Sequence, residues 1–198
     1  AINLMSDETF ENKNILKIII SKIKQNKKIF LSIGVIIVIG FFLILFLENR
    51  QDEKNIQISK EFNKAKILIE NDNKNDSYDI LKNIITKKHK FYSPSSLYLI
   101  IDFEMESDHK KIIKLFDEVI SIKKIKKNDR DLIKIKKAIF MSNYYAEQDL
   151  LKELNPIINS NSIWRSKAIQ ILINYFSIKG DQLKANQYKK ILIDNVSQ

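Results

Sequence analysis

Apolar residues recur every three or four positions through most of the chain after residue 48. Segments such as KILIEN, YDILKNII, LYLIIDF and AIQILINYF show this spacing, which places their apolar side chains on one face of an α-helix. Glycine and proline, which sheet proteins need for their turns, occur here only as Pro94, Pro156 and Gly180. The pattern predicts an all-α fold in which polar breaks separate amphipathic helices.

The polar breaks recur at a spacing that indicates repeated helical hairpins. Asp76, Asp108, Asp149 and Asp181 each follow a break, at intervals of 32, 41 and 32 residues. A period near 34 residues of paired helices is the tetratricopeptide pattern, and the longer interval implies an insertion that includes the basic linker KKIKKND. We therefore expect residues 48–198 to form a tetratricopeptide-like helical-hairpin solenoid of about eight helices.

Apolar and aromatic residues keep the same offsets from these aspartates. Eight residues before them stand Leu68, Ile100, Met141 and Ile173. Five before the last three stand Phe103, Tyr144 and Phe176. Four after them come Ile80, Ile112, Glu153 and Ala185, with Glu153 the exception. Eight after them come Ile84, Phe116, Ile157 and Lys189, with Lys189 the exception.

The last break predicts a tight turn between two helices. Gly180 follows an apolar-periodic segment, as the left-handed residue at a helix C-terminus does, and Asp181 is a typical residue for capping the next helix. Ala185 takes the small position that lets the second helix approach the first. The residues before the other aspartates (Asn75, Ser107 and Gln148) adopt the left-handed conformation less readily, so those turns are expected to be built differently.

Three further signals concern helix ends. Ser93 is expected to cap a helix that has Pro94 at its first position. Either Ser162 or Asn161 is expected to cap the helix that carries Trp164. Pro156 lies inside DLLKELNPIINS and is expected to kink or split that helix.

Residues 29–47, IFLSIGVIIVIGFFLILFL, carry no charge. As a helix this run would span about 28 Å, close to the thickness of a hydrocarbon core. A cleaved signal peptide would have a shorter apolar region followed by small residues, whereas this run continues into ENRQDE. The segment therefore predicts a single retained transmembrane helix.

Lysines flank the apolar run unevenly, with five in residues 17–28 and mixed charges after residue 47. The bias predicts a cytoplasmic segment 1–28 and a periplasmic region 48–198, in a single-pass protein of the cell inner membrane. Within the first segment, Ile15, Ile19 and Ile23 share one helical face. They predict either an amphipathic helix at the membrane surface or an extension of the membrane helix.

The net charge of +10 raises the question of nucleic-acid or lipid binding. The basic residues are nearly all lysine rather than the arginine that nucleic-acid readers favour, so no nucleic-acid partner is expected. The densest basic patch, residues 123–137, could contact anionic lipid or an acidic partner. We favour a solvated linker and helix face there.

The sequence offers little for catalysis. His89 and His109 stand among lysines without metal-ligand spacing and are expected to be solvated. There is no phosphate loop, nucleophile elbow or HExxH motif, and there is no cysteine. We expect no catalytic residue, metal, cofactor or small-molecule substrate, and we do not expect an enzyme.

A basic N-terminal stretch, one membrane span and a tetratricopeptide-like region together resemble the ancillary subunit of the bacterial SecYEG translocon, the YfgM-like proteins. The resemblance covers nearly the whole chain in layout and is best in the last 45 residues, LNPIINSNSIWRSKAIQILINYFSIKGDQLKANQYKKIL. The positions that carry it are Trp164, Arg165, Ala168, Gly180, Asp181 and Ala185. It implies an inner-membrane protein whose partners are the translocon and periplasmic chaperones or emerging chains.

In the tetratricopeptide register, one side of the last complete hairpin is polar and predicts a peptide-binding groove. Its residues are Lys167, Gln170, Asn174 and Ser177. Ile169, Ile173 and Phe176 are expected to pack inward. The alternatives are that the polar side is only solvated, and that the protein is a structural accessory subunit of another membrane complex with the repeat region as a scaffold.

Overall fold

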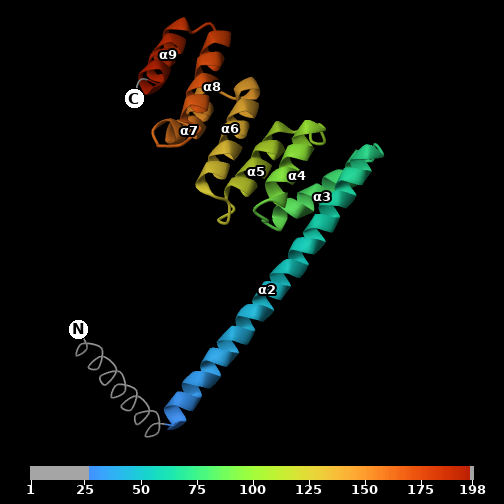
Figure 1. Cartoon of the computed structure of the whole chain (residues 1–198). Helices are drawn as coiled ribbons and strands as arrows, with labels where there is room; N and C mark the ends of the chain where they lie inside the picture. The colour runs from blue at the N-terminus through green and yellow to red at the C-terminus, as the bar shows by residue number, and fades with distance from the viewer. Residues whose placement is uncertain (1–26, 197–198) are drawn as a thin grey trace, which may run out of the picture. The chain divides into compact units, whose positions relative to one another are not determined.

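A computed structural model describes residues 27–196, which form eight α-helices and no strand (Figure 1). The helices are α2 (Lys27–Glu70), α3 (Lys74–Thr86), α4 (Tyr92–Asp102), α5 (His109–Ile120), α6 (Lys127–Tyr144), α7 (Glu147–Ile158), α8 (Arg165–Ile178) and α9 (Gln182–Val196). The predicted all-α fold is confirmed for these residues. Nearly all of the predicted cytoplasmic segment 1–28 lies outside them.

The chain divides into two compact units, Ala1–Ile56 and Gln57–Gln198. In the first unit, α2 contains the apolar run 29–47, and its described apolar side chains are exposed; Ile36 and Phe42, for example, are 68% and 65% exposed. A search of the described residues for a helix long and apolar enough to cross a membrane finds none. The transmembrane helix 29–47 therefore stays a prediction.

The second unit is built from helical hairpins. Each helix from α3 to α9 packs on the next, and α3 also packs on α5 and α6 on α8. The C-terminal turns of α2 join α3, because the Ser77 hydroxyl donates a hydrogen bond of 3.0 Å to the carbonyl oxygen of the fully buried Ala65. Consecutive helices therefore pack as helical hairpins, and the turns near the four aspartates connect α2 to α3, α4 to α5, α6 to α7 and α8 to α9.

Apolar side chains of these helices form two core clusters. The first joins the C-terminal part of α2 to α3, α4 and α5 and includes Leu81, Leu97 and Phe116. The second joins α6 to α9 and includes Leu154 and Phe176. Because α6 contributes Ile133 to the first cluster and Ala138 to the second, it connects the two halves of the unit.

The turn at Gly180 has the predicted geometry. Gly180 adopts a φ of 80°, and the N–H of Asp181 donates to the carbonyl of Phe176 at 2.9 Å, which is the Schellman bond that closes a helix. The Asp181 carboxylate then accepts the N–H of Lys184 at 3.0 Å and caps α9. Ala185 is fully buried, so the small residue does lie where the two helices meet.

Three other helices end at a left-handed residue that is not glycine. Asp72, Lys88 and Glu104 have φ values of 58°, 53° and 52° and follow α2, α3 and α4. The N–H groups of Asn73 and Met105 close the same Schellman bond, to Leu68 and Ile100. The chain therefore needs only one glycine after the apolar run, because the other turns accept the modest strain of a side chain at positive φ.

The predictions for helix ends are only partly correct. Ser93 is not the cap of α4; it is buried inside the first turn, and its hydroxyl donates to the carbonyl of Ile84 on α3 at 3.0 Å. Pro156 does not split α7, which runs through it to Ile158. Neither Ser162 nor Asn161 caps α8, whose N-cap position is Trp164, without a side-chain cap. The Ser162 oxygen accepts the N–H of Trp164 at 3.3 Å in the preceding turn, and its hydroxyl donates to the buried Asp131 on α6 at 2.7 Å.

Candidate protein-binding face

The four polar residues predicted to line a groove lie on one face of α8. Lys167 and Asn174 are exposed, and Gln170 and Ser177 are half-buried. Their spacing of three, four and three residues keeps them in one stripe along the helix. The side-chain amide of Gln170 donates a hydrogen bond of 2.9 Å to the side-chain oxygen of Asn174. We call this set the α8 stripe.

The opposite side of α8 is held by the core, as predicted. Ile169, Ile173 and Phe176 are 0%, 5% and 1% exposed. The Phe176 ring stacks on Tyr188 of α9, with 5.6 Å between centroids and 9° between planes. Because the buried side fixes the rotation of α8, the stripe is held as a rigid polar surface.

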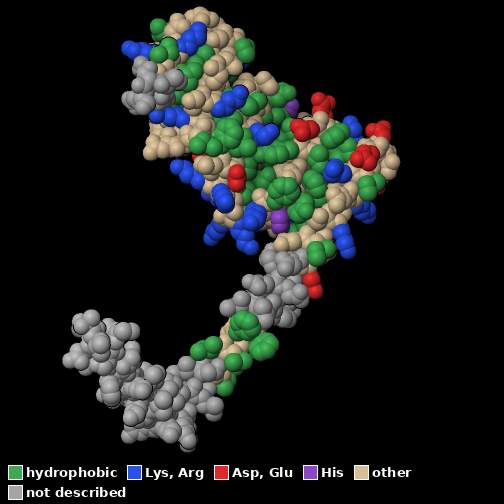
Figure 2. Space-filling model, viewed as in Figure 1, with side chains coloured by type: hydrophobic (Ala, Val, Ile, Leu, Met, Phe, Trp, Pro, Cys, Tyr) green, Lys and Arg blue, Asp and Glu red, His purple; other side chains and the backbone are tan. Residues whose placement is uncertain are grey.

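The matching face of α4 is apolar. When α4 and α8 are aligned on the left-handed residues that end them, Glu104 and Gly180, the counterparts of Asn174 and Ser177 are Tyr98 and Ile101. Both are half-buried, and the ammonium of Lys136 on α6 lies 4.5 Å from the centre of the Tyr98 ring. Figure 2 shows hydrophobic side chains gathered over the middle helices of this unit. The corresponding positions are thus apolar on α4 and polar on α8.

His109 takes part in an aromatic cluster rather than facing only solvent. Its ring centroid lies 3.7 Å from that of Tyr144 and 5.6 Å from that of Phe140, which joins the start of α5 to the end of α6. Tyr144 is 54% exposed, so the cluster presents an aromatic surface. Among residues 27–196, no group of three or more His, Cys, Asp or Glu side chains is placed to hold a metal ion.

His89 has a structural role that the sequence analysis missed. Its Nδ1 accepts the N–H groups of Phe91 and Tyr92, at 3.2 and 3.1 Å, and so caps the start of α4. Burial, followed by the charges of Lys90 and Lys124, lowers the pKa of His89. The neutral ring that results has the free nitrogen that this cap requires.

The basic patch 123–137 is not uniformly solvated. Its lysines up to residue 127 are exposed, but the Arg130 guanidinium donates to the carbonyls of Ile120, Ile122 and Ile125 at 3.0–3.1 Å. Further along α6, Lys137 is buried between Asp117 and Glu153. Arg130 and Lys137 in the second half of the patch therefore hold the fold together, whereas the lysines of the first half, together with the exposed Lys136, form a charged surface.

The α8 stripe, the half-buried apolar residues Tyr98 and Ile101, and the aromatic cluster are three candidate contact surfaces of the repeat unit. Comparison with protein-family models, with curated proteins and with solved structures gives no match to this chain.

Proposed function

We propose that the protein is a membrane-anchored helical-repeat interaction protein, an accessory of the Sec translocon that links it to periplasmic chaperones or emerging chains. The observation that carries the proposal is the array of packed helices, in which corresponding helix positions are apolar on α4, at Tyr98 and Ile101, and polar in the α8 stripe. Surfaces of both kinds on one repeat unit suit an extended peptide that carries both apolar and polar side chains.

The anchor is supported by the apolar run 29–47 within α2. Its described side chains are exposed over a continuous stretch: Val35, Ile36, Ile37, Val38, Ile39, Phe41, Phe42 and Leu43. A surface of exposed large apolar side chains calls for a nonaqueous environment or a partner. The excess of lysine before the run supports a cytoplasmic N-terminus and a periplasmic repeat unit.

The second candidate is a structural accessory subunit with a permanent partner. Ile178 and Leu183 flank the Gly180 turn and are 85% and 74% exposed. Exposed large apolar residues beside a rigid turn favour a stable, apolar contact in a larger complex. In that case the repeat unit would serve as a scaffold.

Site-specific photo-crosslinking in native membranes separates these functions. A photoreactive phenylalanine analogue replaces Asn174 in the α8 stripe or, as a matched exposed control, Lys189 on α9. We expect the Asn174 probe to capture translocon subunits, chaperones or secreted chains, and the Lys189 probe to capture much less. One stoichiometric membrane complex captured outside the secretion machinery would support the scaffold function. Equal capture at both positions would contradict a role for the stripe.

A further inference from the structure

In the half of the second unit from the end of α2 to the start of α6, charge is segregated between the two edges. Because consecutive helices run antiparallel, the α3–α4 and α5–α6 connections share one edge, and the α2–α3 and α4–α5 turns share the other (Figure 1). We call the first pair, residues 87–91 and 121–126, the basic edge. Its lysines are Lys87, Lys88, Lys90, Lys123, Lys124 and Lys126, all exposed, and neither connection contains an acidic residue.

The two connections of the basic edge lie close enough to act as one surface. The two helices that lead into these connections, α3 and α5, pack on each other, so the connections that follow them lie on neighbouring parts of this edge. Figure 2 shows Lys and Arg side chains gathered on the edge where the α5–α6 connection lies. Glu118 and Asp129 flank the second connection, but Lys127 stands beside Asp129, and the net charge of the edge remains strongly positive.

The opposite edge is acidic. The α2–α3 and α4–α5 turns, residues 71–73 and 103–108, contain Asp72, Glu104, Glu106 and Asp108 and no lysine. The Lys74 ammonium donates to the carbonyl of Phe103 at 3.3 Å and so joins the two turns. Lys110 and Lys111 follow the second turn, and Lys111 pairs with Glu106 at 3.5 Å, but Glu70, Asp76 and Asp102 also flank the turns, so the edge remains net acidic. An anionic surface would therefore attract one edge and repel the other.

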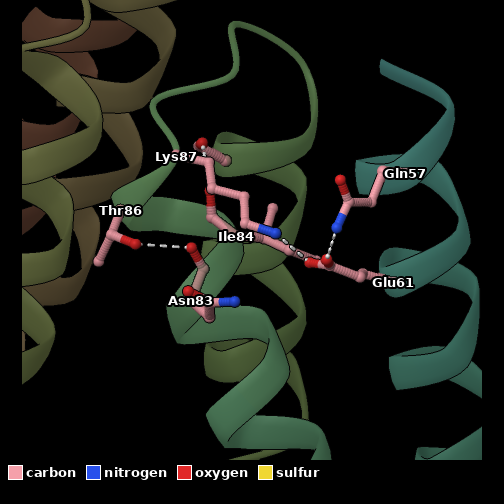
Figure 3. A network of polar contacts seen from close by, with 7 residues as sticks. Gln57, Glu61, Asn83, Ile84, Thr86 and Lys87 are labelled. Carbon is pink, nitrogen blue, oxygen red and sulfur yellow. Dashed lines mark hydrogen bonds and ion pairs between the residues drawn. The ribbon is translucent and has the colours of Figure 1, made fainter. Parts of the chain in front are cut away.

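The chain enters the second unit at the basic edge. Gln57, the first residue of the unit, donates a hydrogen bond of 3.3 Å to Glu61, and Glu61 forms an ion pair with Lys87 at the end of α3 (Figure 3). Residues 48–56 alone separate Gln57 from the apolar run 29–47. Even fully extended, these residues would reach no more than about 30 Å, so the basic edge is tethered near the end of that run.

We propose that the basic edge docks on anionic lipid headgroups of the membrane that holds the run 29–47. The inference rests on the proposed anchor. Ammonium groups near an anionic surface gain attraction that decays within a Debye length of about 8–10 Å, so a short tether is what makes these lysines effective. Docking orients the acidic edge away from the membrane and holds the α8 stripe at a fixed tilt to it.

The test uses the full chain in nanodiscs and a single dye at each edge, which is possible because the sequence has no cysteine. Ser121→Cys places the dye on the basic edge and Ser107→Cys places it on the acidic edge; both serines are exposed. Nanodiscs contain phosphatidylcholine alone or with phosphatidylglycerol, together with a headgroup-labelled quencher lipid. We expect severalfold stronger quenching of the Ser121 dye in the anionic discs, reversed by high salt, and no such change for the Ser107 dye.

Charge variants separate docking from nonspecific attraction. Replacing Lys88, Lys90, Lys123 and Lys124 by glutamine is expected to abolish the quenching of the Ser121 dye. The matched control replaces Lys110, Lys152, Lys189 and Lys190, which are also exposed, and is expected to keep it. A chain that enters the discs but shows equal quenching at both edges, or in both lipids, overturns the docking. The same result is expected if the lysines bind an acidic protein instead of lipid. A chain that does not enter the discs overturns the anchor itself.

Discussion

Phe176→Ala is expected to destabilise the repeat unit by about 3–5 kcal/mol, the usual cost of removing a fully buried phenylalanine. Phe176 is 1% exposed and packs on Tyr175 and Tyr188, so the truncation leaves a cavity between α8 and α9. Urea unfolding of the full chain in detergent, followed by circular dichroism, measures the change.

Phe103→Ala is the matched control, because Phe103 has the same offset from its aspartate as Phe176. Phe103 is 39% exposed and follows the last residue of α4, so its loss is expected to cost at most about 1 kcal/mol. Equal losses for the two variants would show that both aromatics are core residues and that the described ends of α4 and α8 are wrong.

Lys137→Met is expected to destabilise the protein by about 2 kcal/mol or more, although it conserves side-chain volume. The Lys137 side chain is 5% exposed, and its ammonium bonds Asp117 on α5, at 2.7 Å, and Glu153 on α7. Removing the ammonium leaves the carboxylate of Glu153, whose side chain is 19% exposed, without its partner, and an unpaired, mostly buried charge is costly. The same urea titration provides the measurement.

The double variant Lys137→Met with Glu153→Leu is expected to recover most of the loss, because an apolar pair can replace a buried ion pair. The control is Lys114→Met, at an exposed position on α5, which is expected to change the free energy of unfolding by less than about 0.5 kcal/mol. Failure of the double variant to recover would mean that Lys137 stabilises the fold by packing its methylene groups rather than by its charge.

The ion network also predicts a dependence on pH. Burial would lower the pKa of Lys137, but the hydrogen bonds to Asp117 and Glu153 outweigh it and raise the pKa. A raised pKa contributes stability that is complete below the unfolded lysine value of about 10.4 and is lost as pH rises through the folded value. The stability of the parent chain should therefore fall faster above that pH than the stability of the double variant.

The second helices of the hairpins could be predicted well from the sequence. Ile84, Phe116 and Ile157, each eight residues after its aspartate, are buried, and so are Ile112 and Ala185. Each aspartate lies at the start of a helix, either as its cap or in its first turn. Counting forward from it therefore stays in register with the same helix.

Counting backward across the turns was less successful. The α4–α5 turn spans residues 103–108, whereas the α8–α9 turn spans 179–181, so a fixed offset of five residues reaches different points of the preceding helix. Phe176 falls on the core, whereas Phe103 and Tyr144 fall at helix ends and are exposed. The same difference in turn length hid the apolar residues Tyr98 and Ile101 at the α4 positions that correspond to the α8 stripe.

Polar contacts between helices could not be predicted from the sequence. Lys137 and Asp117 are 20 residues apart, and in a chain rich in lysine nothing marks Lys137 as the buried one. Glu153 did stand out as the one polar residue in its repeat position, and its pairing with Lys137 explains the exception. His89 and Arg130 likewise act on backbone groups, which no pattern of side chains reveals.

Protease accessibility in right-side-out membranes tests the central claim, a repeat unit anchored by residues 29–47, most directly. The full chain carries an epitope tag at each end, and protease is added outside the spheroplasts. The account predicts that the C-terminal tag is lost while the N-terminal tag remains on a short membrane-bound fragment that includes residues 29–47. A protected C-terminal tag, or an N-terminal fragment released from the membrane, would contradict it.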